Sequence, residues 1–373
     1  MKVLILSCNT GGGHNSCAQA IQQSLQSRGD SCDIVDSLGF CSGKLSKFMS
    51  WGHSTMYRRI PGLFRFGYGF AERHPGMLKD DAAAYKLLTG GTEELRQLLL
   101  EKEYDAVICT HVFSGLLLRE TLLRFPMQLK TAFVATDYTC SPGAAKSDLD
   151  LYFIPAESLR EEFISQGVPL DRIVASGIPV RPEFYESSNR NSAKKALGID
   201  PSRFHILVTC GSMGCGPMEH LAKQLHVRMP PSCEISIVCG RNEQLYKQMA
   251  TAFQGKGNVH VYGYVKDMNT LMDSADLCVT KPGGLSTSEA AVKRLPMVLL
   301  DVVSGCEERN LNFFLKCGGA VSALGVDGVV GRCLVLAKEP ETLERMRNAL
   351  AMQFPDNATE IISGTMHALE DRK

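Results

Sequence analysis

Short apolar stretches typical of β-strands alternate with helical stretches along the whole sequence, and this alternation limits the possible folds more than any other feature. It is typical of parallel sheets covered by helices, because parallel strands need a crossover between them that is usually helical. The order therefore predicts an α/β protein. The predicted strands are 2–7, 32–36, 105–110, 130–136, 150–154, 204–210, 234–239, 258–262, 276–280 and 296–300, and the predicted helices are 13–28, 78–102, 113–124, 157–166, 217–228, 242–253, 267–274, 284–293, 307–316, 340–351 and 356–371.

The length predicts two domains, because single cores stop growing at about 250–300 residues and this chain has 373. Pro179 and Pro182 interrupt any helix between the two halves, and the polar stretch 186–195 that follows them suits an exposed linker. The expected parts are a first domain over 1–178, a linker over 179–203, a second domain over 204–355, and a C-terminal helix within 356–373 that is a candidate to pack on the first domain.

Charge and cysteine usage exclude several classes of protein. The 40 lysines and arginines balance 40 aspartates and glutamates, so we expect no nucleic-acid partner. The 14 cysteines form no C-x-x-C pair and no zinc-finger spacing, so we expect reduced thiols in the core. We also expect no metal and no other cofactor. No apolar run has the ~18 residues of a membrane span or begins the chain as a signal peptide. We therefore expect a cytoplasmic protein whose membrane contact, if it has one, is peripheral on the inner face.

A glycine-rich turn, Ser-Cys-Asn-Thr-Gly-Gly-Gly-His over 7–14, follows the first predicted strand and opens a helix. Gly12 and Gly13 let the backbone approach a ligand closely, and a helix N-terminus favours an anion or an ionising hydroxyl. His14 is placed at the carboxyl end of the strand, where open α/β sheets bind ligands. Its neutral ring can take a proton from an acceptor hydroxyl near neutral pH. The alternative is an exposed histidine in a helix-capping turn.

A second glycine-rich turn, Thr-Cys-Gly-Ser-Met-Gly-Cys-Gly-Pro, occupies 209–217 after another apolar strand. Its G-x-x-G-x-G pattern differs from the dinucleotide G-x-G-x-x-G, and neither turn contains the G-K-[ST] of a P-loop. These differences disfavour an oxidoreductase or a kinase. The candidate ligand contacts are Gly211, Ser212 and Gly214.

A third constellation, Thr-Lys-Pro-Gly-Gly-Leu-Ser-Thr-Ser-Glu-Ala-Ala, spans 280–291 and opens a helix with hydroxyl residues. Backbone amides in such a first turn can hold a diphosphate, and the candidate contacts are Gly283, Gly284, Ser286 and Thr287. Two roles are possible for Glu289: its carboxylate accepts hydrogen bonds from both hydroxyls of a ribose, or it closes a capping box at the start of the helix.

The third constellation also carries a resemblance to a known family. Residues 281–289, preceded by Gly-Tyr-Val-x-Asp-Met over 263–268, resemble the nucleotide-binding half of the diacylglycerol glycosyltransferases, which include plant monogalactosyldiacylglycerol synthase and bacterial processive diacylglycerol glucosyltransferases. The glycine turn 11–14, Ala-Thr-Asp-Tyr at 135–138 and Gly-Ile-Pro-Val at 177–180 fit the same family in the same order. The chain is more distantly similar to the transferase that adds N-acetylglucosamine to lipid I.

This resemblance implies a GT-B fold, in which two Rossmann-like domains face each other across a cleft with the acceptor domain first. It also implies an inverting, metal-independent transfer from a UDP-sugar, with His14 as the general base for a lipid hydroxyl and Asp137 orienting or assisting it. The two later glycine turns would hold the diphosphate, and helix N-termini would stabilise it as it leaves. Glu289 would bind the ribose, and Tyr264 and Val265 the uracil.

One block departs from the family pattern, which reads P-G-Q-E before the last donor helix. This chain has Ser-Gly-Cys-Glu-Glu-Arg-Asn over 304–310, so Cys306 replaces the glutamine expected to contact sugar hydroxyls. Glu307 and Asn310 are retained and are further candidate donor contacts. The departure leaves the donor sugar, glucose, galactose or another, and turnover itself open.

The stretch 44–73 combines six basic residues with the single tryptophan, Trp51, and six other aromatic residues. Interleaved aromatic and basic side chains suit the headgroup region of an anionic bilayer, where a lipid acceptor would be met. The alternative is that these aromatics form the core of a helical insertion. RNA binding is poorly supported, because no strand carries the aromatics.

The sequence thus favours transfer of a hexose from a UDP-sugar to diacylglycerol or a related membrane lipid. The nearest alternative is a UDP-N-acetylglucosamine transferase that acts on a polyprenyl-linked acceptor. UDP-sugar 2-epimerisation is a second alternative that needs no lipid surface. A UDP-sugar sensor without catalysis is a third, which Cys306 keeps open although His14 and Asp137 argue against it.

Overall fold

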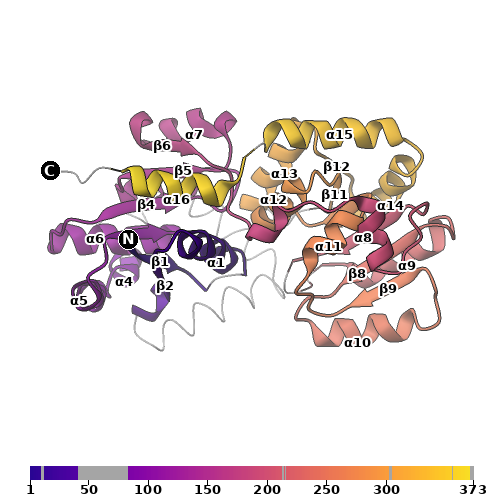
Figure 1. Cartoon of the computed structure of the whole chain (residues 1–373), viewed down its shortest axis with the longest axis horizontal. Helices are drawn as coiled ribbons and strands as arrows, with labels where there is room; N and C mark the ends of the chain where they lie inside the picture. Colours follow the sequence, from indigo (N-terminus) through magenta and orange to yellow (C-terminus); the bar gives the residue numbers. More distant parts are fainter. Residues whose placement is uncertain are drawn as a thin grey trace. The chain divides into compact units, whose positions relative to one another are not determined.

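The chain folds into two compact α/β units (Figure 1). The first unit comprises 1–182, 303–309 and 356–373, and the second comprises 183–302 and 310–355. Each unit contains one six-stranded sheet in which all strands run parallel, as the alternating pattern predicts. The computed structural model describes residues 1–9, 12–40, 83–211, 214, 216–301, 305–354 and 356–369.

The sheet of the first unit has the order β2-β1-β3-β4-β5-β6. Two of its inner strands, Ala106–Cys109 and Leu151–Ile154, are apolar and buried along their whole length, as expected where helices cover both faces of a parallel sheet. The strands are β1 (Lys2–Ser7), β2 (Ser31–Asp36), β3 (Ala106–Cys109), β4 (Lys130–Val134), β5 (Leu151–Ile154) and β6 (Ile173–Ala175), and the helices are α1 (Gly12–Ser27), α4 (Ala83–Leu88), α5 (Thr92–Lys102), α6 (Val112–Arg124), α7 (Arg160–Ser165) and α16 (Ala358–Ala368).

The C-terminal helix α16 lies beside α1 on one face of this first sheet (Figure 1). Ile362 and Met366 of α16 and Ile21 of α1 belong to one buried cluster with the sheet. The hydroxyl groups of Ser24 and Ser363 are 2.9 Å apart between the two helices. A segment more than 300 residues away in sequence therefore completes the core of the first unit.

The sheet of the second unit has the order β12-β11-β10-β7-β8-β9. Counted along the chain, this is the 3-2-1-4-5-6 order of a doubly wound Rossmann fold. The strands are β7 (His205–Thr209), β8 (Glu234–Val238), β9 (Val259–Tyr262), β10 (Leu277–Thr280), β11 (Met297–Leu299) and β12 (Ala320–Ser322), and the helices are α8 (Arg190–Ala196), α9 (Met218–Arg228), α10 (Glu243–Ala252), α11 (Met268–Ser274), α12 (Gly284–Val292), α14 (Gly325–Leu336), α15 (Pro340–Gln353) and α13 (Cys306–Cys317), of which residues 306–309 belong to the first unit.

Several elements differ from the sequence-based expectations. The single helix expected over 78–102 is two helices, α4 and α5, because the chain turns at 89–91. A Cβ atom on Gly91 would lie 2.4 Å from the carbonyl oxygen of Phe40, so only glycine permits this close approach. The edge strands β6 and β12 have three residues each, and α14 contains three glycines; their sequence signals are correspondingly weak.

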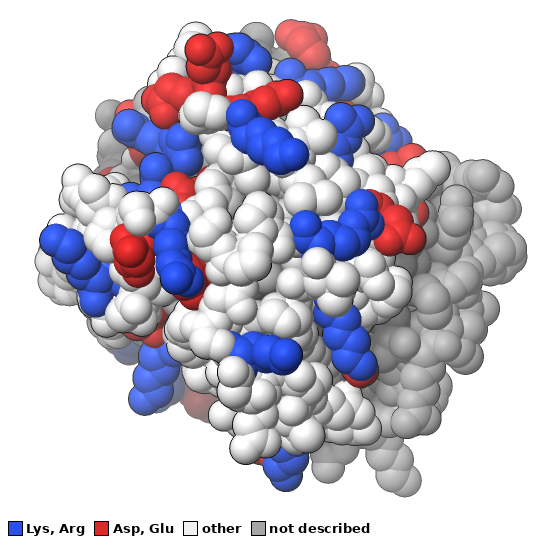
Figure 2. Space-filling model, turned by 90° about the vertical axis from the view of Figure 1, so that its right-hand side faces the viewer, with Lys and Arg blue, Asp and Glu red and all other residues white. Residues whose placement is uncertain are grey.

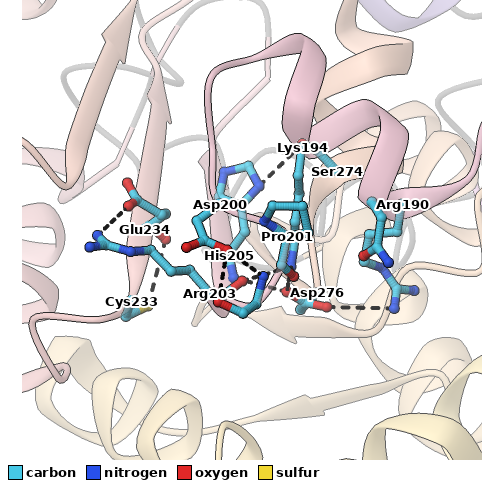
Figure 3. A network of polar contacts seen from close by, with 12 residues as sticks. Arg190, Lys194, Asp200, Pro201, Arg203, His205, Cys233, Glu234, Ser274 and Asp276 are labelled. Atoms are coloured by element: carbon cyan, nitrogen blue, oxygen red, sulfur yellow. Dashed lines mark hydrogen bonds and ion pairs between the residues drawn. The ribbon is translucent and has the colours of Figure 1, made fainter.

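The segment expected as an exposed linker over 179–203 contains α8, which packs against α11 of the second unit. Lys194 of α8 is buried and donates hydrogen bonds to the Asp276 carboxylate and to the Arg203 carbonyl, both at 2.7 Å (Figure 3). A lysine is rarely buried unless it is paired, and this pairing explains why a polar stretch belongs to a core. The compact second unit therefore begins at residue 183.

The face shown in Figure 2 has acidic and basic side chains interspersed among neutral ones. This mixture matches the zero net charge of the chain. None of the helices in the described parts of the chain is long and apolar enough to cross a membrane. The aromatic and basic stretch 44–73 lies outside the described residues.

Candidate active site

Each sheet has one place where the chain changes the direction in which it adds strands. In the first sheet β2 and β3 lie on opposite sides of β1, and in the second β8 and β10 lie on opposite sides of β7. Open α/β sheets bind ligands outside the carboxyl ends of the strands at such switch points. The turns that follow β1 and β3, and those that follow β7 and β10, are therefore the candidate binding elements. All three glycine-rich segments are among them.

His14 is the third residue of α1 and is partly buried at the switch point of the first sheet. Its Nδ1 atom is 2.9 Å from the carbonyl oxygen of Thr110 and 3.0 Å from the hydroxyl oxygen of Thr136. A carbonyl oxygen can only accept, so this contact assigns the proton of the neutral ring to Nδ1. Nε2 is then the unprotonated nitrogen, which is the form that a general base needs.

The segments that follow β3 and β4 surround His14. Thr110 and His111 directly follow β3, and Thr136 follows β4 by two residues. The His111 ring lies against the His14 ring, with centroids 4.7 Å apart and planes at 82°. These contacts were not predicted from the sequence. The available signal was position, because residues that directly follow a buried strand beside β1 lie at the same edge of the sheet.

The turn before His14 is held by side chains of its own segment. Asn15 accepts a hydrogen bond from the Ser7 hydroxyl at 2.6 Å and donates one to the Asn9 side chain at 3.3 Å. These bonds join the end of β1 to the start of α1. Gly12 is exposed and Gly13 is partly buried in the first turn of α1. The structure thus presents the backbone at these two glycines as the sequence predicts, although their ligand contacts stay a prediction.

Asp137 is partly buried and lies in the loop after β4, next to Thr136. Glu162 of α7 fixes this loop by accepting hydrogen bonds from the Thr139 hydroxyl at 2.5 Å and from the backbone amide of Cys140 at 2.9 Å. Asp137 therefore occupies the same edge of the sheet as His14, on a loop that is anchored from behind. Its role as an orienting or assisting group stays a prediction.

Cys306, which replaces the expected glutamine, belongs with residues 305–309 to the first unit. Burial raises the pKa of its thiol well above the usual value, and the carboxylates of Asp137 and Glu307 raise it further. The thiol therefore stays protonated and is a weak nucleophile. Glu307 is partly buried in the first turn of α13.

In the second unit, the turn after β7 depends on left-handed glycines. Gly211 and Gly214 have φ angles of 71° and 54°. A Cβ atom on Gly214 would lie 2.3 Å from the carbonyl oxygen of Cys239, so this turn packs directly against the end of β8. Asn242 strengthens the contact with a hydrogen bond of 3.4 Å to the Gly214 carbonyl. Ser212 lies outside the described residues.

The turn after β10 leads into α12, whose first amides are the candidate diphosphate donors. Gly283 is the N-cap residue with an extended backbone, and Gly284 and Ser286 lie in the first turn, where helical amides have no partner within the helix. Thr287 differs from the expectation. Its amide and its hydroxyl both donate to the Gly283 carbonyl, at 3.1 and 2.9 Å, and the residue is fully buried. Thr287 therefore stabilises the helix start.

Glu289 is partly buried on α12, one turn beyond Ser286, where it remains a candidate for the ribose. Asn310 is fully buried and donates from Nδ2 to the Pro282 carbonyl at 3.0 Å. This bond helps to hold the backbone of the turn that precedes α12. Its predicted contact with the donor stays a prediction.

Tyr264 and Val265 follow β9 at the same edge of the second sheet. The Tyr264 side chain is 56% exposed, and the guanidinium of Arg241 lies 5.2 Å from the centre of its ring. A flat base can stack on such an exposed ring. The uracil contact itself stays a prediction.

Among the described residues, no group of three or more His, Cys, Asp or Glu side chains is arranged to hold a metal ion. The candidate groups described above are one histidine, one neighbouring carboxylate and the amides of two glycine turns. This set can remove a proton from a hydroxyl in the first unit and bind an anion in the second.

Comparisons with known proteins agree with this arrangement. Residues 14–180 match the family model of monogalactosyldiacylglycerol (MGDG) synthase, and residues 205–310 match that of the glycosyltransferase family 28 C-terminal domain. The chain is 25% identical over 372 residues to a processive diacylglycerol beta-glucosyltransferase of Staphylococcus saprophyticus, with 99% of this chain and 93% of that protein covered.

Solved structures show the same fold. MurG of Acinetobacter baumannii aligns with a TM-score of 0.63 at 15% identity and covers 99% of each chain. A UDP-GlcNAc 2-epimerase of Neisseria meningitidis bound to UDP-GlcNAc aligns with the same TM-score at 14% identity, over 99% of this chain and all of that one. At these identities the similarity establishes the fold, whereas the reaction must be inferred from the residues of the site.

Proposed function

The chain belongs to the diacylglycerol glycosyltransferase family and has the GT-B fold, and from this premise we propose that it transfers a hexose from a UDP-sugar to diacylglycerol or a related membrane lipid. We infer further that the transfer inverts the configuration at the anomeric carbon and needs no metal ion. Both inferences are tested by the experiment below.

The observation that carries the proposal is the tautomer of His14. The Thr110 carbonyl holds the proton on Nδ1 at 2.9 Å, which leaves Nε2 free of a proton. In the proposed reaction Nε2 takes the proton of the lipid hydroxyl while the oxygen attacks the anomeric carbon. The bond between this carbon and the phosphate oxygen breaks, and UDP leaves. A base of this kind contributes typically 10²–10⁴-fold to a rate.

The donor site is proposed at the switch point of the second sheet. The amides of Gly284 and Ser286 and the dipole of α12 favour the diphosphate and the charge that grows on it as the bond breaks. Glu289 is proposed to bind the ribose, and Tyr264 the uracil. Gly214 and Asn310 act behind these residues, because they fix the backbone of the two turns.

The acceptor places the reaction at a membrane surface. We propose that the enzyme binds there peripherally, through the aromatic and basic stretch 44–73. Transfer should then be faster on anionic than on neutral liposomes, and added salt should reduce the difference.

A UDP-sugar 2-epimerase is an alternative function, because such an enzyme has the same fold over nearly the whole chain and the fold alone does not select the reaction. An epimerase would change UDP-N-acetylglucosamine without any lipid. A sensor would bind UDP-sugar and release no UDP, and a polyprenyl-linked transferase would require a different acceptor.

The test is a transfer assay on anionic liposomes that contain diacylglycerol, with UDP-glucose and UDP-galactose supplied separately and EDTA present. His14→Ala is compared with wild type, and His220→Ala, an exposed histidine on α9, is the control. We expect glycolipid of inverted configuration from one donor, a loss of roughly 10²–10⁴-fold in His14→Ala, and no loss in the control. UDP binding without any glycolipid would overturn the proposal in favour of another acceptor or a sensor.

A further inference from the structure

His111 is the neighbour of His14 to which the proposed reaction assigns no role. It is the N-cap residue of α6, and its Nδ1 atom accepts a hydrogen bond from the backbone amide of Phe113 at 3.1 Å. The Phe113 ring also packs against it, with centroids 4.5 Å apart. The His111 ring is thus fixed by the helix that it caps.

The cap also determines the charge of His111. A ring nitrogen that accepts an amide hydrogen bond cannot itself carry a proton, so the proton of His111 is on Nε2 and the ring is neutral. Protonation of Nδ1 would break the cap and place a positive charge at the N-terminus of α6, where the helix dipole disfavours it. A neutral ring beside His14 leaves His14 able to accept a proton.

The two histidine rings meet edge to face, at 4.7 Å and 82°. His14 is therefore held at two places: the Thr110 carbonyl and the Thr136 hydroxyl hold Nδ1, and the His111 ring limits rotation about the bond from Cβ to the ring. Without the second contact, the ring can turn, which moves Nδ1 away from the Thr110 carbonyl, so that the proton is no longer held on Nδ1.

We propose that His111 is a positioning residue for the sugar transfer, because its neutral, helix-capping ring holds the His14 ring in the orientation that keeps Nε2 available as the base. This inference rests on the proposed function. It adds a requirement that neither the glycine turn nor His14 itself imposes: an aromatic ring must stand at position 111.

Two substitutions separate the effect of the aromatic ring of His111 from the effect of its helix cap. His111→Asn keeps a good N-cap residue and removes the ring, whereas His111→Phe keeps an aromatic ring and removes the cap. His226→Asn is the matched control, because His226 makes a similar edge-to-face contact with Phe253 in the second unit, at 5.6 Å and 84°. Each variant is assayed for kcat, for the KM of the UDP-sugar and for the midpoint of thermal unfolding.

We expect His111→Asn to unfold at the wild-type temperature, with a kcat roughly 10- to 100-fold lower and an unchanged KM, because a small misplacement of a catalytic group has costs of this size. His111→Phe should unfold at a lower temperature and keep most of kcat. The control should keep kcat. Equal kcat in His111→Asn and wild type, or a kcat that follows the unfolding temperature across both variants, would overturn the proposal.

The ¹⁵N chemical shifts of His14, assigned with His14→Ala, supply a readout that needs no turnover. Wild type should show the Nδ1-protonated tautomer, and His111→Asn a mixture of both tautomers. A pure Nδ1-protonated form in His111→Asn would contradict the positioning role. Because these spectra do not depend on a sugar acceptor, they test whether His111 orients the His14 ring separately from the liposome assay, which tests the proposed function.

Discussion

The buried imidazole of His205 should make the stability of the second unit depend on pH. His205 is the first residue of β7 and is fully buried within the network of Figure 3. Its Nε2 atom is 2.8 Å from the Ser236 hydroxyl, and its Nδ1 atom is 3.1 Å from the Ser274 hydroxyl. Ser274 already donates its proton to the Leu271 carbonyl, so it accepts from Nδ1–H. Nε2 then accepts from Ser236, and the neutral ring is fully satisfied.

A proton added to Nε2 would lose the bond from Ser236 and bury a charge. Burial lowers the pKa of His205 from 6.5 to about 4, while a hydrogen bond with Ser274 and the Asp276 carboxylate act in the opposite direction. The unfolded chain binds a proton near pH 6.5, and the folded chain does not until about pH 4. Stability therefore decreases as the pH falls through this window.

The loss of unfolding free energy is about 1.4 kcal/mol for each unit of pKa difference between the folded and unfolded chain. It is therefore about 3 kcal/mol over the whole window and about 2 kcal/mol between pH 7.5 and 5. A suitable assay is urea unfolding at both pH values, with hydrogen exchange of the β7 peptide reporting on the second unit alone. The variants are His205→Gln and His205→Asn, whose amides replace one ring nitrogen each, and the exposed His220→Gln is the control.

Both His205 variants should be less stable than wild type at pH 7.5 and should lose about 2 kcal/mol less than wild type on going to pH 5. His220→Gln should follow wild type. If the His205 variants show the same pH dependence as wild type, the reasoning from burial is refuted, because another group must then supply the dependence.

Three further predictions concern the turns and the C-terminal helix. In Gly214→Ala the added Cβ would lie 2.3 Å from the Cys239 carbonyl oxygen, so this variant should bind UDP at least about tenfold more weakly, as calorimetry can measure. In Gly211→Ala the added Cβ would have nothing within 4 Å, so this variant should lose only about 1–2 kcal/mol of stability through backbone strain. Asn310→Ala leaves the buried carbonyl of the α12 turn unpaired and should lower stability by about 1–3 kcal/mol and raise the KM of the UDP-sugar; an unchanged KM would contradict its positioning role. Burial would raise the pKa of Asp30, but hydrogen bonds from the chain's amino terminus and from the histidine of α16 lower it overall. Asp30→Asn should therefore destabilise the first unit at neutral pH, and its difference from wild type should disappear as the pH falls below 3.8 through the lowered pKa, as thermal unfolding can show.

The sequence predicts the layers of this protein well, because the relevant signals are local. Ten of the strands are apolar runs bounded by glycines or polar residues, and their bounds agree with the structure within one or two residues. His14 and the turns at Gly211 and Gly283 are likewise visible in the sequence, since a glycine-rich turn between a strand and a helix has a local pattern. The sequence pattern does not indicate the short edge strands β6 and β12 or the glycine-containing helix α14. These elements are stabilised by the parts of the protein that pack against them.

The tertiary structure decides which residues surround these turns. Thr110 and Thr136 are about 100 residues from His14 in the chain, yet the order β1-β3-β4 brings both to its Nδ1 atom and thereby assigns its tautomer. Tertiary structure also decides what two of the predicted site residues contact. The hydroxyl of Thr287 donates to the Gly283 carbonyl at the start of α12, and Asn310 donates to a carbonyl of a turn 28 residues away. A side chain's proton and its partner depend on neighbours that are distant in the chain, and only the folded arrangement supplies those neighbours.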